Sequence, residues 1–181
     1  MSSPARTQPQ GTNTHYLQRL FRSVDKDGNG VIDAVELQSA LSNGTWKSFN
    51  ADTVRMIIHM FDRTRRGNLN FDEFVAAWKY ITSWLSCFQT FDRDNSGAID
   101  KQELSEALTR FGYRLALPTV DFMVVKFDRD GKGSMNFDDF IQCCVTLHTM
   151  TEAFKRHDVN QNGWITISYE EFLKTGMSLM M

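Results

Sequence analysis

The chain has 181 residues, of which 41% are hydrophobic and 23% are charged, and its formal net charge is −2. This length suffices for one sizeable core or two small lobes, and the near-neutral charge gives no overall drive toward nucleic acid. No apolar run approaches a membrane span, and the N-terminus lacks the apolar stretch of a signal peptide. Three cysteines in helical patterns are typical of reduced thiols. We therefore expect a cytoplasmic protein whose association with membranes is at most peripheral.

One structural unit recurs along most of the chain. Residues 1–14 hold two of the three prolines and almost nothing apolar, which predicts a disordered tail. Helical patterning begins near Tyr16, and residues 15–181 then repeat a glycine-centred loop after an apolar stripe of helical spacing. The loops span residues 25–36, 62–73, 92–103, 128–139 and 158–171. The pattern predicts an all-α domain of five helix–loop–helix units.

The first loop, residues 25–36, has the residue types of a calcium site. Calcium is a hard cation that takes about six to eight oxygen ligands, and the twelve-residue loop wraps oxygens around one point. Gly30, at the sixth position, permits the sharp turn that this requires. The predicted ligands are Asp25, Asp27, Asn29, the carbonyl of Val31, Asp33 and Glu36.

The third loop, residues 92–103, matches the same pattern equally well. Its predicted ligands are Asp92, Asp94, Ser96, the carbonyl of Ala98, Asp100 and Glu103. The ligand count predicts dissociation constants of about 10⁻⁷–10⁻⁵ M for Ca²⁺ at both loops, with Mg²⁺ as a competing ion. These two loops are the predicted main metal sites.

The other three loops each depart from the pattern. Loop two has Arg66 at the fifth position, where a guanidinium repels a cation, and loop four has Lys132 there. Loop four also ends in Asp139, which reaches less far than glutamate. Loop five carries its closing acid, Glu171, two places late. We predict structural roles for these loops, with weak calcium binding left open for them.

The spacing of the loops predicts how they are joined. Thirty residues separate Asp62 from Asp92, and thirty separate Asp128 from Asp158. After each twelve-residue loop, the remaining residues 74–91 and 140–157 contain no glycine or proline, so each segment predicts one helix shared by two loops, about 27 Å long. The eighth residue of each loop is apolar and predicts a short β-bridge between loops one and two and between loops three and four.

The fifth unit is left without a pairing partner within the chain. An exposed strand edge beside apolar side chains is an association site, and the simplest closed solution is a two-fold dimer. The predicted dimerisation residues are Trp164, Ile165 and Phe172. The alternative is a monomer in which the apolar C-terminal segment folds back over loop five.

These features resemble the penta-EF-hand family over roughly residues 15–181. The resemblance rests on the five units, their alternating spacing, the two-residue insertion in loop five, and the segments 41–46, 78–82, 92–97 and 111–115. It implies a homodimeric calcium sensor and adaptor. Such a protein exposes an apolar aromatic groove with calcium and recruits Pro/Tyr-rich partner segments in membrane trafficking or cell-death pathways. The resemblance also implies nuclear, endoplasmic reticulum and endosomal pools beside the cytoplasmic one.

Aromatic residues near the linkers are the candidates for partner recognition, because such side chains grip extended proline-rich peptides well. They are Trp46, Trp78, Trp84, Phe111 and Tyr113. The alternative for each is a place in the core. Two other functions stay open, namely a regulatory subunit of a calpain-like cysteine protease and a simple calcium buffer. We expect no enzymatic activity, because Cys144 and His148 lack an orienting acid in the pattern and are typical of helix packing.

Overall fold

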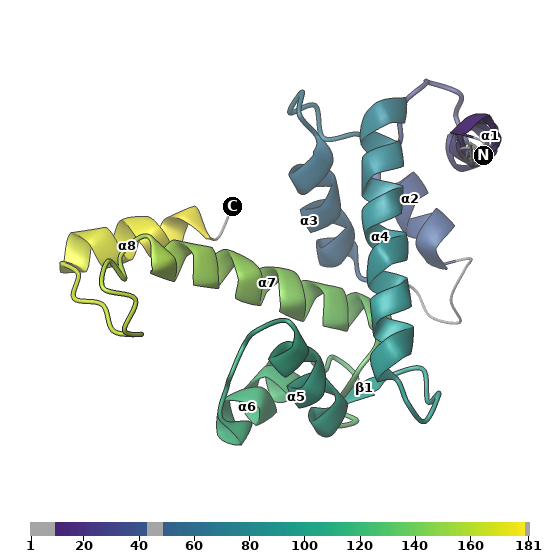
Figure 1. The fold of residues 1–181 in the computed structure, drawn as a ribbon. Helices are drawn as coiled ribbons and strands as arrows, with labels where there is room; N and C mark the ends of the chain where they lie inside the picture. The colour runs from purple at the N-terminus through teal and green to yellow at the C-terminus, as the bar shows by residue number, and fades with distance from the viewer. Residues whose placement is uncertain (1–9, 43–48, 180–181) are drawn as a thin grey trace, which may run out of the picture. The chain divides into compact units, whose positions relative to one another are not determined.

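The computed structural model describes residues 10–42 and 49–179, with side chains from residue 14 onward. Trp46 lies outside the described residues. The helices are α1 (Gln10–Val24), α2 (Ala34–Ser42), α3 (Ala51–Phe61), α4 (Phe71–Phe91), α5 (Lys101–Arg110), α6 (Leu117–Phe127), α7 (Phe137–Lys155) and α8 (Tyr169–Ser178) (Figure 1). The strands are β1 (Ile99–Asp100) and β2 (Ser134–Met135). The predicted all-α class with short β-bridges is confirmed.

The two predicted shared helices are present. The 21-residue helix α4 joins the second loop to the third, and the 19-residue helix α7 joins the fourth to the fifth. The apolar pattern predicts that each outgoing helix starts just after its loop, at Leu37 in the first unit, but each begins three residues earlier, as α2 does at Ala34. The reason is local: in loop three, for example, the ninth residue, Asp100, is the N-cap, and the last three loop residues form the first helical turn.

Helix α1 begins at Gln10, earlier than the predicted start near Tyr16 and inside the segment 1–14 predicted to be disordered. The buried stripe that fixes α1 is the predicted one and includes Leu17, Phe21 and Val24. Once such a stripe holds a helix, each added residue gains a hydrogen bond at little cost, so the helix extends beyond its apolar residues.

The loops pair as the apolar eighth positions predict. Ile32 and Leu69 exchange two backbone hydrogen bonds of 2.8 Å, which joins loop one to loop two. In the antiparallel pair β1–β2, Ile99 lies opposite Met135 and joins loop three to loop four. All four side chains are fully buried, so each bridge also anchors its loops to a core.

The chain divides into two units, one ending at Thr90 and one beginning at Phe91. In the first unit, the fully buried ring of Phe74 meets Phe21 edge-on at 5.4 Å and stacks on Trp78 at 5.7 Å. In the second unit, Phe140 and Leu104 are fully buried at equivalent places on α7 and α5. None of the helices in the described ranges has the length and apolar character that a bilayer crossing requires.

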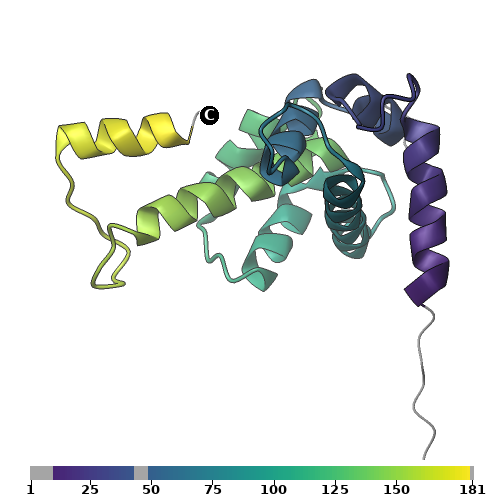
Figure 2. The same ribbon diagram turned by 90° about the horizontal axis from the view of Figure 1, so that it is seen from above.

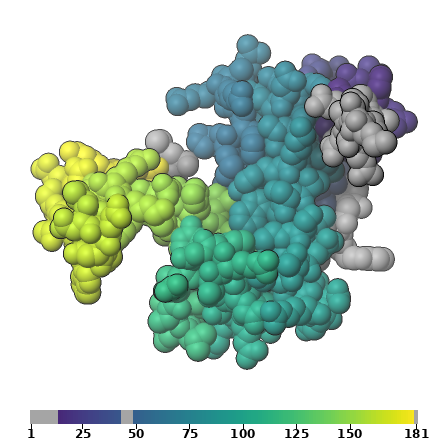
Figure 3. Space-filling view, in the orientation of Figure 1, coloured from purple at the N-terminus to yellow at the C-terminus, as the bar shows by residue number. Residues whose placement is uncertain are grey.

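The fifth helix–loop–helix has little packing of its own. Helix α8 follows the C-terminal end of α7, and none of its residues is buried (Figures 1 and 2). In the space-filling view this yellow segment stands clear of the α5–α6 region of the same unit (Figure 3). His157 Nε2, just beyond the end of α7, lies 3.2 Å from Thr175 Oγ1 on α8. The residues of α8 therefore leave apolar surface uncovered within the chain.

The core of the first unit gives a stability prediction. Phe74→Ala removes a fully buried ring and leaves a cavity between α1 and α4, so the free energy of unfolding should fall by about 3–5 kcal/mol. Urea unfolding followed by circular dichroism measures this loss. Met60→Ala, at a 43% exposed position on α3, is the control and should change stability by less than about 0.5 kcal/mol. Equal effects of the two substitutions would contradict the assigned core.

Candidate metal centre

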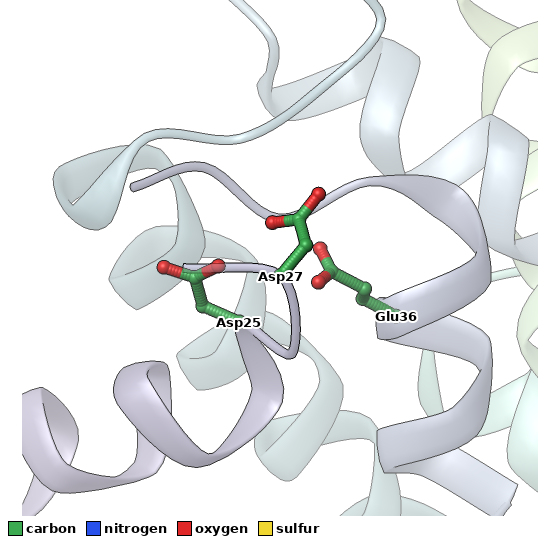
Figure 4. A group of neighbouring side chains, drawn as sticks. All are labelled: Asp25, Asp27 and Glu36. Atoms are coloured by element: carbon green, nitrogen blue, oxygen red, sulfur yellow. The ribbon is translucent and has the colours of Figure 1, made fainter. Parts of the chain in front are cut away.

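The first candidate centre lies where loop one meets α2. Asp25 follows α1, Asp27 lies in the loop, and Glu36 lies in the first turn of α2, with their carboxylates facing a common space (Figure 4). One carboxylate oxygen from each lies within 4.8 Å of the others. Hard oxygen donors gathered at this separation fit a calcium ion.

Backbone hydrogen bonds orient these carboxylates. The N–H of Asn29 donates to Asp25 at 3.1 Å and to Asp27 at 3.0 Å, and the N–H of Gly30 donates to Asp25 at 3.0 Å. Gly30 has φ 82°, a left-handed conformation that favours glycine at this turn. The loop therefore holds its acidic oxygens together through its own backbone.

Glu36 ties the two ends of loop one together. Its Oε1 accepts the N–H of Lys26 at 2.8 Å, and its Oε2 accepts the N–H of Asp33 at 3.1 Å. The side chain of Asp33 in turn accepts the N–H of Glu36 at 2.9 Å. This reciprocal pair is a capping box at the start of α2.

The second candidate centre repeats this geometry in loop three. Asp92, Asp94 and Glu103 each place a carboxylate oxygen within 4.8 Å of the others. Glu103 accepts the N–H of Arg93 at 2.9 Å and the N–H of Asp100 at 3.1 Å. The hydroxyl and N–H of Ser96 hold the pKa of Asp94 below its usual value, so this carboxylate is ionised, as a metal ligand must be.

The remaining predicted ligands surround these clusters in supporting positions. Asp33 and Asp100, at the ninth positions, cap α2 and α5 and are not members of the two clusters. The amide of Asn29 donates to Asp27 at 2.8 Å, and the hydroxyl of Ser96 donates to the carbonyl of Ala98 at 3.0 Å. The N–H of Val31 donates to Asn29 at 2.9 Å.

Loop two has the same backbone closure without an acidic cluster. Glu73 accepts the N–H of Arg63 at 3.0 Å and the N–H of Asn70 at 3.0 Å, as Glu36 does in loop one. Thr64, at the third position, donates its hydroxyl to Asp62 at 3.1 Å. Among the described residues, loop two has no group of three acids close enough together to hold a metal ion.

Loop four is closed by a side chain that sequence reasoning missed. The Nε of Arg129 donates to Asp139 Oδ1 at 2.6 Å, and its Nη2 donates to Asp138. Lys132 lies 3.4 Å from Asp130. Residue types alone do not distinguish this contact, because the second position is basic in loops one to four. The distinguishing feature is the short Asp139, which leaves room for a guanidinium.

Loop five keeps an N-cap at the start of its outgoing helix, but it loses the closing contact that Glu36 makes in loop one. Ser168 caps α8 by accepting the N–H of Glu171 at 3.2 Å, so Glu171 holds the helical position of Glu36. The inserted residues therefore precede Ser168. Glu171 lies 3.8 Å from Lys174 on its own helix instead of closing onto the loop start. The exposed fraction of Trp164 is 82%, and Ile165 is half-buried.

The predicted recognition aromatics are partly exposed. Trp78 and Trp84 are half-buried on α4, and Trp84 contacts Tyr80 at 6.0 Å. Phe111 is 38% exposed at the C-cap of α5, where its ring meets Phe91 edge-on at 5.8 Å. Tyr113 is half-buried beyond that cap. These side chains are neither fully core nor fully solvent-exposed.

The cysteine that could act as a nucleophile is buried. Cys144 is 5% exposed, whereas His148 is exposed. Burial raises the pKa of the neighbouring Cys143 to about 12, which keeps that thiol protonated. This arrangement is that of thiols packed into a helix interface.

Helix–loop–helix pairs with these acidic clusters define a calcium-binding protein of the EF-hand class. A family model described as an EF-hand domain pair matches residues 15–79 and 82–144. A sorcin from Schistosoma japonicum is 44% identical over 93% of this chain and 98% of its own length. Peflin from Danio rerio is 38% identical over 96% of this chain, which spans only 64% of that protein. The chain therefore belongs to the penta-EF-hand family of calcium-binding proteins.

A solved structure agrees with this assignment. It is a homolog of programmed cell death 6 protein from Leishmania major Friedlin, with a TM-score of 0.80 and 31% sequence identity. The likeness covers 90% of this chain and 93% of that one. The chain also resembles programmed cell death 6 protein itself, which is also called apoptosis-linked gene-2 protein, in segments 41–46, 78–82, 92–97 and 111–115.

The two centres give a prediction for calcium titration. Glu36→Gln and Glu103→Gln each remove the closing charge of one loop, so each variant should lose one calcium site, with affinity there falling about 100-fold or more. Isothermal titration calorimetry counts the sites. Glu73→Gln is the matched control, because Glu73 makes the same backbone contacts in loop two. Loss of a tight site in the control would contradict the assignment.

Proposed function

We propose that this chain is a calcium sensor and adaptor with two main calcium sites, in loops one and three. With calcium bound it presents an apolar aromatic groove and recruits Pro/Tyr-rich segments of partner proteins. It acts in the cytoplasm and on the surfaces of trafficking membranes, or in cell-death pathways. The proposal rests on the coupling between a metal loop and an aromatic pair in the second unit.

That coupling runs along helix α5. Glu103 lies in the first turn of α5 and belongs to the acidic cluster of loop three, and Phe111 is the C-cap at the other end. The ring of Phe111 contacts Phe91, which ends the incoming helix of the same loop. A metal ion that shifts Glu103 therefore tilts α5 and separates or realigns the two rings. This supports a groove that opens with calcium.

The first unit offers related surface. Trp78 and Trp84 lie on α4, the outgoing helix of loop two, and both rings keep part of their surface exposed. Amphipathic rings held at partial exposure suit an extended proline-rich peptide, because the peptide needs little ordering on binding. Partly exposed rings that can bind a peptide favour an adaptor over a simple calcium buffer, because a buffer needs no exposed aromatic surface.

Peptide binding tests the adaptor role. A synthetic Pro/Tyr-rich peptide should bind in calcium and not in EDTA, as measured by calorimetry. Phe111→Ala should weaken this binding about tenfold or more, because it removes an apolar anchor. Phe122→Ala is the control, since Phe122 is 67% exposed on α6 and makes no part of the proposed groove. Equal binding with and without calcium would sink the proposal.

The fifth unit is proposed to form a homodimer. Helix α8 is a ten-residue helix with no buried residue, and a helix of that length is marginal in water without a packing surface. Trp164, Phe172 and Met177 are 82%, 60% and 65% exposed. A second copy offers the same apolar residues in a two-fold arrangement that closes on itself.

The dimer gives its own prediction. Phe172→Asp places a charge on the exposed apolar surface of α8, so the protein should sediment as a monomer where the unmodified chain sediments as a dimer. Analytical ultracentrifugation at micromolar concentration makes the measurement. Val125→Asp on α6, at a 74% exposed position, should leave the dimer intact. A monomeric unmodified chain would support the folded-back alternative instead.

A further inference from the structure

Loop four contains two carboxylates that are removed from solvent. The side chain of Asp139 is fully buried and that of Asp138 is 8% exposed. Burial raises the pKa of Asp139, and the hydrogen bond from Arg129 opposes that rise. Buried carboxylates need a compensating cation or hydrogen-bond donors, because their desolvation is otherwise costly. The guanidinium of Arg129 supplies both, since it contacts each carboxylate.

Loop four differs from loops one, two and three in the group that bonds to its closing carboxylate. In loops one, two and three, the backbone N–H of the second residue donates to the closing glutamate at 2.8–3.0 Å. In loop four the closing residue is shorter by one methylene, and the side chain of the second residue makes the contact instead. The side chain of Arg93, also at a second position, pairs with Glu106 outside the closing position.

The rest of loop four keeps a calcium-type arrangement. Asp128 accepts the N–H of Gly133 at 2.6 Å and the N–H of Asp130 at 3.1 Å, as the first aspartate of loop one does with its own loop. The amide of Asn136 lies 3.3 Å from Asp130 and 3.4 Å from Asp139. Lys132 adds a second cation beside Asp130. Acidic oxygens and two side-chain cations thus share the loop.

We propose that Arg129, assisted by Lys132, stands in for the calcium ion of loop four. The guanidinium fixes Asp139 and the first turn of α7 in the closed arrangement at every calcium concentration. Strand β2 of this loop pairs with β1 of loop three. Loop three therefore always binds its ion beside a partner loop that is already closed. Arg129 is a positioning residue in this account, and it acts through Asp138 and Asp139.

The test replaces the internal cations and asks whether calcium can take their place. R129Q/K132N is made in the full chain that also carries E36Q/E103Q, so that the two main sites are weakened equally in both proteins. In EDTA its thermal unfolding midpoint should fall by about 5–10 °C relative to the E36Q/E103Q chain. Adding millimolar CaCl₂ should raise the midpoint of R129Q/K132N by more than it raises that of the E36Q/E103Q chain, so that most of the difference between the two proteins disappears.

The control variant and the contrary results distinguish a role of the positive charge of Arg129 from a role in packing alone. R63Q/R66N removes the charges at the same two positions of loop two, and it should not lower the midpoint in EDTA, because Glu73 is held there by backbone N–H groups. An unchanged midpoint in R129Q/K132N overturns the proposal, as does a fall that calcium does not reverse. If R129Q/K132N is unfolded in EDTA, refolding by calcium supports the proposal, and failure to refold overturns it.

Discussion

The closing carboxylate at the end of a loop determines how the helices on either side of that loop are held. In loops one, two and three a single glutamate accepts one N–H from the loop start and one from the cap of the outgoing helix. The incoming helix, the loop and the outgoing helix are thereby fixed to one side chain. On the proposed assignment, a metal ion at Glu36 or Glu103 would compete for the same oxygens, so ion binding would be coupled to the position of the outgoing helix.

The closing contact differs from loop to loop. Loops one and three combine the closing glutamate with a group of three acids that could hold a metal ion. Loop two has the glutamate without such a group among the described residues, and loop four has an aspartate that bonds to a guanidinium. In loop five, Glu171 keeps its place on the helix but pairs with Lys174 on that same helix. One repeat therefore carries several different closures.

The sequence sufficed for features that depend on spacing and residue type. The shared helices α4 and α7, the bridges Ile32–Leu69 and Ile99–Met135, and the acidic loops follow from periodicity and ligand chemistry. The predicted starts of the outgoing helices were three residues too late. Asp33 and Asp100 cap α2 and α5, so the last three loop residues form the first helical turn. The Arg129 contact was missed because it depends on where a long side chain points, and spacing alone carries no information about that.

Each β-bridge joins a loop that has a group of three acids to a loop that has no such group among the described residues. Two metal-binding loops joined by a β-bridge would share the cost of ordering, and binding at the first would favour the second. If loops one and three are the metal sites, as proposed, the partner loops that contain Leu69 and Met135 are closed by the protein's own groups, and their ordering cost is met during folding. A single ion would then suffice to move α2 or α5, and the response of each unit would follow the occupancy of one site.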